Sequence, residues 1–419
     1  MTLREDAGQI LQEALAAALP DTAVKKALEG VRFGDGKLVL VAAGKAAWQM
    51  ASAAYSADGL KIGGGVVITK YGYAKGPIGE LSIREAGHPV PDENTFSATE
   101  EVIHMVSGLA PEDTVLFLLS GGGSALFEKP LIPKEELYAL TDRLLACGAD
   151  ITEMNTVRKR LSAVKGGRFA QICAPAHVFS IVLSDIIGDP LDMIASGPAY
   201  PDASSSGQAL SIIKKYDISV SDETIACLRR ETPKRLDNVT TVVTGSVRQL
   251  CSSAEAACRR LGYEPVVLTA SLSCTARDAG SFLGSIAQFH ADDARSIAFI
   301  AGGETVVRLT GKGKGGRNQE IALAAAEKIA GLADCAVFSF GSDGTDGPTD
   351  AAGGFCDGDT AGTLRQKGID IDEVLIRNDS YHALKACGGL IVTGPTGTNV
   401  NDLSIVLIRR KTSGQLEKQ

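Results

Sequence analysis

Short apolar runs alternate along the chain with longer segments whose apolar residues recur at helical spacing. Each apolar run ends in glycine, serine or aspartate before the helical pattern begins. Continuous apolar runs of this length are typical of strands buried on both faces, and their alternation with helices predicts mostly parallel sheets. The predicted strands lie within residues 38–47, 65–70, 114–125, 177–189, 240–246, 296–305 and 336–347.

This alternation predicts the α/β class, with two three-layer α/β/α domains built on Rossmann-like sheets. The length of 419 residues favours two domains over one. Loop-like compositions at 201–208 and 231–238 place the boundary near residue 236. We therefore expect an N-terminal domain at 1–236 and a C-terminal domain at 237–419, either of which can borrow a strand from the other. An inter-domain cleft is the expected place for two substrates.

Composition excludes several classes of protein. With 42 basic and 50 acidic residues the net charge is −8, which argues against general affinity for nucleic acid or for an anionic membrane. No apolar run approaches the roughly 18 residues of a membrane span, and the first 20 residues have the spacing of an amphipathic surface helix. The nine cysteines form no CxxC pair, which is typical of reduced thiols and predicts a cytoplasmic protein.

The segment 302–320, GGETVVRLTGKGKGGRNQE, suggests a phosphate site. Glycines let a backbone approach a ligand, and a helix N-terminus favours negative charge. Lys312, Lys314 and Arg317 add cations, and Glu304 adds a carboxylate that is close enough in sequence to hold a metal. The alternative is an exposed basic loop between a strand and a helix.

Two other strand ends carry candidate chemistry. Lys45 closes the first strong strand in VAAGKAA, where its ammonium can reach a phosphate or carboxylate or can simply lie in solvent. The SGGGSA turn at 120–125 offers backbone N–H groups and hydroxyls to nucleotide phosphates. It is neither a Walker A loop nor a GxGxxG fingerprint. The residues of this turn that we expect to bind nucleotide are Gly121, Gly122, Gly123 and Ser124.

Acidic residues follow another predicted strand. Asp185, Asp189 and Asp192 lie in SDIIGDPLDMIASGP, and carboxylates just past a strand suit Mg²⁺, which often takes one or two of them plus substrate phosphates. The alternative is that they cap a helix or form an Asx turn. The acids of the 341–354 segment lack the spacing of an EF-hand, so they form either a metal site or a turn-rich rim.

A basic run occupies residues 154–168, MNTVRKRLSAVKGGR, in an otherwise acidic protein. At helical spacing Asn155, Arg158 and Ser162 share one face. This face suits an anionic substrate, and a solvated basic face is the alternative. His88 and His382 lie in polar, turn-rich segments, where each is either an aid to catalysis or a local hydrogen-bonding partner.

Taken in order, these segments resemble the glycerate 2-kinase family whose members contain a MOFRL domain. The resemblance spans residues 41 to 402. Small departures occur at Phe127–Lys129, after SGGGSAL, and at Thr345, where aliphatic residues are frequent. The matching stretches are AAGKAA, GHPVPDEN, SGGGSALF, MNTVRKRLSAVKGGR, SDIIGDPLDMIASGP, GGETVVRLTGKGKGGRNQE, GSDGTDGPTDAAGG, RNDSY and TGPTGTNVND.

The resemblance implies ATP- and Mg²⁺-dependent phosphorylation of D-glycerate at its 2-hydroxyl, with Lys45 and Arg317 as important residues. Phosphoryl transfer needs charge neutralisation and positioning more than covalent chemistry, which these residues can supply. One alternative is an NAD(P)H-dependent hydroxypyruvate reductase, although the chain lacks a dinucleotide fingerprint. The other is a non-catalytic protein that binds a nucleotide or sugar phosphate.

The resulting hypothesis assigns each candidate residue a role. Lys45 and Arg317 stabilise the transferred phosphoryl group and hold the glycerate carboxylate, while Asp189 orients the hydroxyl. The 121–124 turn, Lys312 and Lys314 bind ATP, and Asp185 and Glu304 hold Mg²⁺. The expected partners are D-glycerate and ATP, and the protein is expected to be a monomer or a homodimer.

Overall fold

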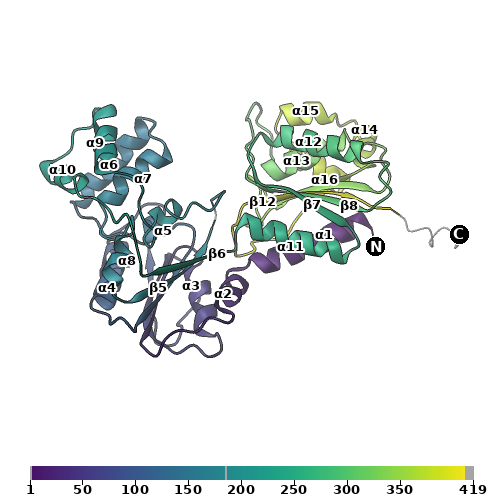
Figure 1. Cartoon of the computed structure of the whole chain (residues 1–419). Coiled ribbons are helices and arrows are strands. Elements are labelled where there is room, and N and C mark those ends of the chain that lie inside the picture. The colour runs from purple at the N-terminus through teal and green to yellow at the C-terminus, as the bar shows by residue number, and fades with distance from the viewer. Residues whose placement is uncertain (1, 185, 411–419) are drawn as a thin grey trace. The chain divides into compact units, whose positions relative to one another are not determined.

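The computed structural model describes residues 2–184 and 186–410, which fold into two compact units. The N-terminal unit comprises residues 20–184 and 189–244. The described residues of the C-terminal unit are 2–19, 186–188 and 245–410. Each unit contains a six-stranded sheet packed between helices (Figure 1). The α/β class expected from the sequence is confirmed.

The sheet of the N-terminal unit is parallel throughout. Its order is β3-β2-β1-β4-β5-β6, so successive strands are added first on one side of β1 and then on the other. In such sheets ligands bind beyond the carboxyl ends of the two strands where the order reverses, here β1 and β4. The strands are β1 (Leu38–Ala43), β2 (Ile62–Lys70), β3 (Ser82–Ala86), β4 (Thr114–Leu119), β5 (His177–Leu183) and β6 (Val239–Thr244).

Helices cover both faces of this sheet, and β1 and β4 are therefore buried along their whole length. Helices α2 (Pro20–Leu28) and α3 (Ala47–Tyr55) pack on one face. Helices α4 (Glu93–Val106) and α8 (Arg168–Cys173) pack on the other, over a core that contains Phe117 and Phe169.

A second layer of helices has a small apolar core of its own and stands apart from the sheet (Figure 1). Two short turns, α5 (Gly123–Leu126) and the 3₁₀ turn η1 (Ile194–Ser196), lie next to each other in this unit. The helices of the second layer are α6 (Lys134–Ala146), α7 (Ile151–Arg160), α9 (Ser206–Lys215) and α10 (Asp222–Leu228).

The sheet of the C-terminal unit is mixed, in the order β11-β10-β9-β12-β8-β7. Among the described strands β7, β8, β9 and β11 run in one direction, while β10 and β12 run in the other. The majority direction agrees with a mostly parallel sheet, although β12 inserts antiparallel between β8 and β9. The strands are β7 (Glu264–Leu272), β8 (Ile297–Gly303), β9 (Cys335–Gly341), β10 (Gly353–Asp357), β11 (Leu390–Ile391) and β12 (Asp402–Ile408).

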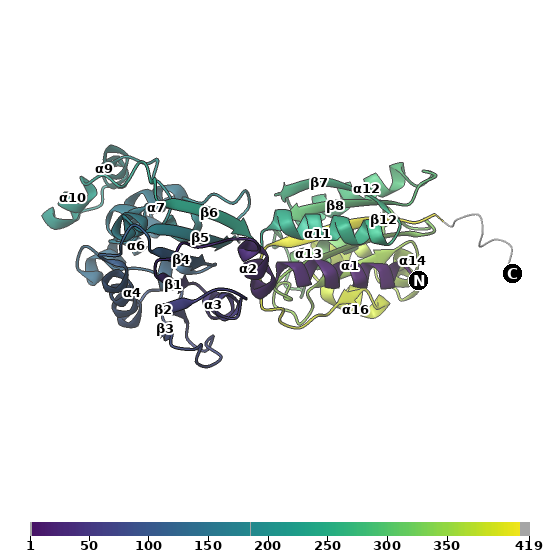
Figure 2. The ribbon, with the colours of Figure 1, turned by 60° about the horizontal axis from the view of Figure 1, so that its bottom comes forward.

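Helices again form the outer layers (Figure 2). Helices α1 (Leu3–Ala18) and α11 (Val247–Arg260) pack together on one face of the sheet. The other face carries the remaining helices of the unit around one apolar core. These are α12 (Ala276–Phe289), α13 (Arg317–Ala326), α14 (Thr360–Gln366), α15 (Ile371–Ile376) and α16 (Ser380–Cys387). None of the helices in residues 2–184 and 186–410 is long and apolar enough to cross a membrane.

The division of the chain differs from the expected boundary in two places. Strand β6 pairs in parallel with β5, so the N-terminal unit runs on to Thr244 rather than ending at residue 236. Helix α1 belongs to the C-terminal unit because the buried Asp6 accepts a hydrogen bond from Tyr263 at 2.5 Å and pairs with Arg409. The two partners of Asp6 lie more than 250 positions from it in the sequence, and local sequence patterns do not report such contacts.

The aromatic core of the N-terminal unit provides a test of the packing. Phe169 is fully buried, with its ring 4.7 Å from that of Phe117 and 5.1 Å from that of Phe127. We expect Phe169→Ala to lower the free energy of unfolding by about 3–5 kcal/mol, because it leaves a cavity. Phe289, which is 85% exposed, supplies a matched control. Urea unfolding followed by circular dichroism should separate the two variants, and equal midpoints would contradict this packing.

Candidate functional site

In the N-terminal unit, the loops that follow β1 and β4 contact each other directly. The Lys45 N–H donates to the Gly121 carbonyl at 2.9 Å, and the Ala46 N–H donates to the Ser120 hydroxyl at 3.1 Å. These loops leave the two strands at which the strand order reverses. The structure therefore brings the AAGK and SGGGSA motifs together where a doubly wound sheet binds ligands.

The side chains of Lys45 and His88 flank this turn. Gly122 has a φ of +85°, and a Cβ there would lie 2.9 Å from His88 Cδ2 and 3.3 Å from Lys45 Cγ. Burial lowers the pKa of His88, and the nearby charges of Lys45 and Lys70 lower it further, which favours the neutral imidazole. Lys45 forms no ion pair with any residue in the described part of the chain. Its charge is therefore available to an anion.

A buried ion pair stabilises the same turn. Lys165 donates to the Ser124 carbonyl at 2.9 Å and pairs with the carboxylate of Glu128. Burial lowers the pKa of Lys165, and the Glu128 charge opposes that shift. Since both side chains are almost fully buried, the pair fixes the backbone of the turn rather than offering a charge to solvent.

The acids of the 184–198 segment have different surroundings. Asp192 lies 3.5 Å from the Lys159 ammonium, so it already has a partner. Asp189 has a φ of +52°, and its Oδ1 is buried without a hydrogen-bonding partner among the described residues. Asp185, the expected metal ligand, lies outside the described residues. Asp189 is thus an unsatisfied carboxylate that a ligand can complete.

In the C-terminal unit, Arg317 begins α13 and is held by two carboxylates. Its Nε and Nη2 donate to Asp402 at 2.5 and 3.1 Å, and its Nη1 lies 3.0 Å from Glu304. Burial alone lowers the pKa of Arg317, but the hydrogen bonds and charge of Asp402, together with Glu304, raise it overall. Burial raises the pKa of Asp402 despite this pairing. The guanidinium is oriented, and its charge is neutralised within the unit.

Asp346 caps the N-terminus of α13. Its carboxylate accepts hydrogen bonds from the N–H groups of Asn318 and Gln319 at 3.1 and 2.8 Å, and from the Gln319 amide at 3.0 Å. Burial raises the pKa of Asp346 to about 6, although these hydrogen bonds act in the opposite direction. The N-terminus of α13, which the sequence suggested as part of a phosphate site, is therefore capped by Asp346 of the 341–354 segment.

The glycine-rich loop that precedes α13 packs against residues 376–381. The N–H groups of Gly311, Gly313 and Lys314 donate to Asn378, Arg377 and Asp379 respectively, at 2.8–2.9 Å. A Cβ on Gly313 would lie 2.6 Å from the Arg377 carbonyl oxygen. The glycines thus permit close packing, and these backbone amides are not available to a phosphate.

The lysines of this loop project differently. The Lys314 ammonium lies over the ring of Tyr381, 4.5 Å from its centre, whereas Lys312 is exposed. His382, on the neighbouring helix, bonds to Asp379 at 2.6 Å, which agrees with a local role for that histidine. The two ammonium groups are the side-chain cations that this loop offers to a phosphate.

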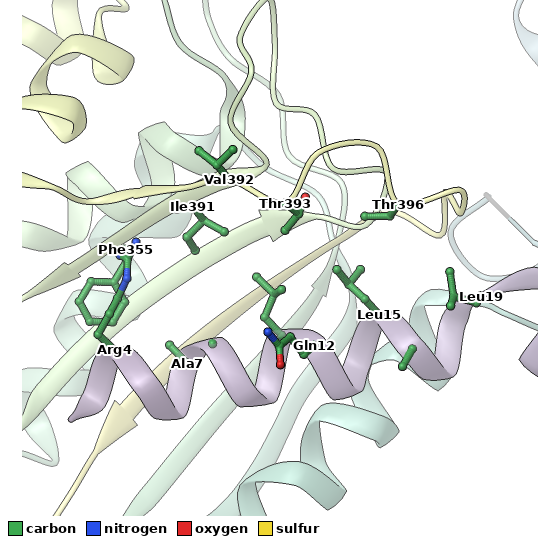
Figure 3. Close-up of a pocket in the computed structure, with 13 residues that line it drawn as sticks. Arg4, Ala7, Gln12, Leu15, Leu19, Phe355, Ile391, Val392, Thr393 and Thr396 are labelled. Atoms are coloured by element: carbon green, nitrogen blue, oxygen red, sulfur yellow. The ribbon is translucent and has the colours of Figure 1, made fainter. Parts of the chain in front are cut away.

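A separate cavity of about 570 Å³ opens beside α1 (Figure 3). Apolar side chains of α1 form one wall, and Phe355 and residues 391–396 form the other. At one end Arg4 lies over the Phe355 ring at 4.7 Å and donates to the Leu390 carbonyl at 2.6 Å. None of the predicted site residues lines this cavity.

Sequence reasoning placed the motifs but missed several partners. It assigned no role to Asp402, which fixes Arg317, or to Asn378, which binds the glycine-rich loop. Asp402 had a local signal, since an acid at the head of an apolar strand is unusual. Lys45 lies in the N-terminal unit and Arg317 in the C-terminal unit.

Comparison with known proteins agrees with this architecture. A domain of unknown function, DUF4147, matches residues 6–229, and the MOFRL family matches residues 297–402. A D-glycerate 2-kinase from Thermotoga maritima is 51% identical over 97% of this chain and 99% of its own length. A glycerate kinase structure from the same organism superposes with a TM-score of 0.92 and the same coverage of both chains. A putative hydroxypyruvate reductase from Agrobacterium vitis is 39% identical over 97% of this chain and 95% of its own.

With its doubly wound N-terminal sheet and a mixed C-terminal sheet that contains the MOFRL match, this chain is one of the class of two-unit α/β proteins. Within that class, this chain belongs to the glycerate 2-kinase family.

The raised pKa of Asp346 predicts a pH dependence of stability. Between its ordinary value of 3.8 and about 6, the folded protein binds a proton that the unfolded chain does not. Its contribution is therefore full below pH 3.8 and is lost as the pH rises through 6, by about 3 kcal/mol. Asp346→Asn should remove this loss.

The measurement compares unfolding free energies at pH 4 and pH 7 for wild type, Asp346→Asn and Asp343→Asn. Asp343 lies in the same loop but is less buried, so its variant is a matched control. Between pH 4 and pH 7, the unfolding free energy of Asp346→Asn should fall less than that of wild type, and that of Asp343→Asn should change as in wild type. The same change in all three proteins would show that Asp346 is not the group responsible.

Proposed function

We propose that this chain phosphorylates D-glycerate at its 2-hydroxyl, using ATP and releasing 2-phospho-D-glycerate and ADP. The observation that carries this proposal is Lys45, which pairs with none of the described residues. It lies beside the SGGGSA turn, at the strand-order reversal of a chain 51% identical to a D-glycerate 2-kinase. In the reaction the hydroxyl oxygen attacks the γ-phosphorus, the bond to ADP breaks, and the hydroxyl proton leaves.

The N-terminal unit supplies the residues best suited to the phosphates. The turn of Gly121–Ser124 lies against the Lys45 backbone and has partly exposed positions at Gly121, Gly122 and Ser124. Backbone N–H groups and hydroxyls of such a turn stabilise negative oxygens. We assign nucleotide phosphate binding to this turn, and charge stabilisation of the transferred group to Lys45.

In the C-terminal unit, the Arg317 guanidinium has a fixed orientation and carboxylate partners. Arg317 is neutralised by Asp402 and Glu304, so an incoming phosphate gains from it only by displacing or sharing Glu304, the more exposed of the two acids. We retain Arg317 as a catalytic candidate on this basis. Lys312 and Lys314 remain candidates for nucleotide contacts through their ammonium groups.

Magnesium fits the donor chemistry of the chain. The described residues contain no cluster of three or more His, Cys, Asp or Glu side chains suited to a metal, but Mg²⁺ bound to nucleotide needs only one or two carboxylates. We propose Asp185 and Glu304 as those ligands, and bound Mg²⁺ would neutralise phosphate charge. Asp189, whose buried Oδ1 has no partner among the described residues, is proposed to accept a hydrogen bond from the substrate hydroxyl.

The reductase alternative draws on the Rossmann-type strand order and on the name of one relative. The turn after β1 reads AAGKAA and lacks the glycines that let a dinucleotide pyrophosphate approach.

The free cysteine thiols are typical of a reducing compartment, and we therefore propose that the protein is cytoplasmic.

The reaction is tested with purified protein, D-glycerate and MgATP, coupled to enolase, pyruvate kinase and lactate dehydrogenase without phosphoglycerate mutase. We expect immediate ATP-dependent NADH oxidation, because enolase accepts 2-phosphoglycerate directly. A signal that appears only after mutase is added would mean phosphorylation of the 3-hydroxyl. NADH oxidation with hydroxypyruvate in the absence of ATP would favour the reductase, and ATP binding without turnover would favour a non-catalytic protein.

The proposed cations are tested by Lys45→Ala and Arg317→Ala. Each should reduce kcat by about 10³-fold or more, by analogy with the loss of a transition-state arginine in other phosphoryl-transfer enzymes. Lys61→Ala in the N-terminal unit and Arg365→Ala in the C-terminal unit remove exposed cations and serve as controls. Folded variants that keep near wild-type rates would remove these two residues from the mechanism.

A further inference from the structure

The basic run at 158–168 contains five cations whose partners differ. Lys159 and Arg160 pair with Asp202, at 3.2 and 3.5 Å, and Lys165 pairs with Glu128. Arg168 donates to the carbonyls of Arg160 and Ser162, at 3.3 and 2.8 Å, at the end of α7. Four of the five therefore have a structural role within the unit, which agrees with neither a solvated basic face nor a simple anion-binding stripe.

Arg158 is the exception. It is partly exposed, pairs with no carboxylate among the described residues, and donates from Nη2 to the Ser124 carbonyl at 3.3 Å. A guanidinium has five N–H donors in a planar fork. Arg158 therefore lies against the SGGGSA turn with most of its donors free for a ligand.

Polar side chains that suit a hydroxyl group adjoin Arg158. The Ser124 hydroxyl lies 3.3 Å from that of Ser196, and the Ser196 hydroxyl donates to Asn155 Oδ1 at 2.9 Å. Asn155 and Arg158 are three residues apart on α7 and share a face. Ala195 and Ser196 have φ values of +49° and +61°, a strained conformation that clusters at functional sites.

The charges around the Ser124 carbonyl do not balance. Lys165 and Arg158 both donate to that oxygen, and Glu128 is the carboxylate that pairs with one of them. The described cluster therefore carries one excess positive charge beside a buried ion pair. An anionic ligand would neutralise it.

We propose that Arg158 binds the carboxylate of the hydroxy-acid substrate and that the Ser124 hydroxyl, held by the buried Ser196 and Asn155, contacts a substrate hydroxyl. The backbone N–H groups of the 121–124 turn are then left to the nucleotide phosphates. This assignment rests on the proposed function and refines it, since Arg317 already has two carboxylates of its own. A planar guanidinium matches a carboxylate through two parallel hydrogen bonds.

A nucleotide phosphate is the competing anion. Phosphate oxygens are acceptors and need only donors, whereas this cluster also presents the partly exposed hydroxyl oxygen of Ser124, which can accept a hydrogen bond. A substrate hydroxyl both donates and accepts, so it can use this oxygen. The cluster therefore favours the hydroxy acid over the nucleotide.

Calorimetric binding of D-glycerate and, separately, of MgATP tests the assignment on wild type, Arg158→Gln, Arg158→Lys and Arg143→Gln. We expect Arg158→Gln to weaken D-glycerate binding about 10- to 100-fold, the effect of losing a charged hydrogen-bonded pair, with ATP binding unchanged. Arg158→Lys, which keeps the charge but loses the fork, should lie between. Arg143, an exposed arginine that likewise donates to one backbone carbonyl, is the matched control.

Several outcomes would overturn the assignment. Unchanged D-glycerate affinity in Arg158→Gln, weaker ATP binding alone, or a wild type that does not bind D-glycerate would each exclude it. An equal loss of both ligands with a lower Tm would assign Arg158 a structural role instead. A wild type that binds D-glycerate through Arg158 but transfers no phosphate would overturn the proposed function and leave the carboxylate site in place.

Discussion

The parallel pairing of β1 with β4 is the constraint on which the N-terminal site depends. Because the chain continues from β1 toward β2 and from β4 toward β5, the two following loops turn to opposite sides of the sheet. The bond from Lys45 N–H to the Gly121 carbonyl holds them together at their base. Lys45, Ser124 and Arg158, which we assign to the substrates, lie on one of these loops or contact it.

Lys45 and Arg158 of the N-terminal unit differ from Arg317 of the C-terminal unit in their partners. Lys45 and Arg158 have no carboxylate partner among the described residues, whereas Arg317 is bound by Asp402 and Glu304. A neutralised arginine has a fixed direction and little net attraction, while an unpaired one attracts anions before any contact forms. The first kind suits precise geometry during a reaction, and the second kind suits capture of charged substrates.

Sequence patterns located most of the strands and both glycine-rich motifs because these features are local. Buried runs such as 114–119 and 335–341 are continuous and apolar, so their burial is evident from composition. The antiparallel insertion of β12 and the placement of α1 were not predicted, since both depend on pairing across more than 60 residues. Glycines occur both where two backbones pack closely and where a backbone contacts a ligand. The sequence alone therefore predicted that the loop around Gly313 binds phosphate, whereas its glycines permit close packing.

The association of α1 with the C-terminal unit has a consequence for how the chain is made. This helix is synthesised before the N-terminal unit, yet its partners α11, Tyr263 and Arg409 are synthesised after that unit. Its apolar stripe of Ile10, Leu11 and Leu15 must therefore wait while most of the N-terminal unit is produced and able to fold. During that interval the nascent protein presents an unpaired amphipathic helix, which is the kind of surface that chaperones bind.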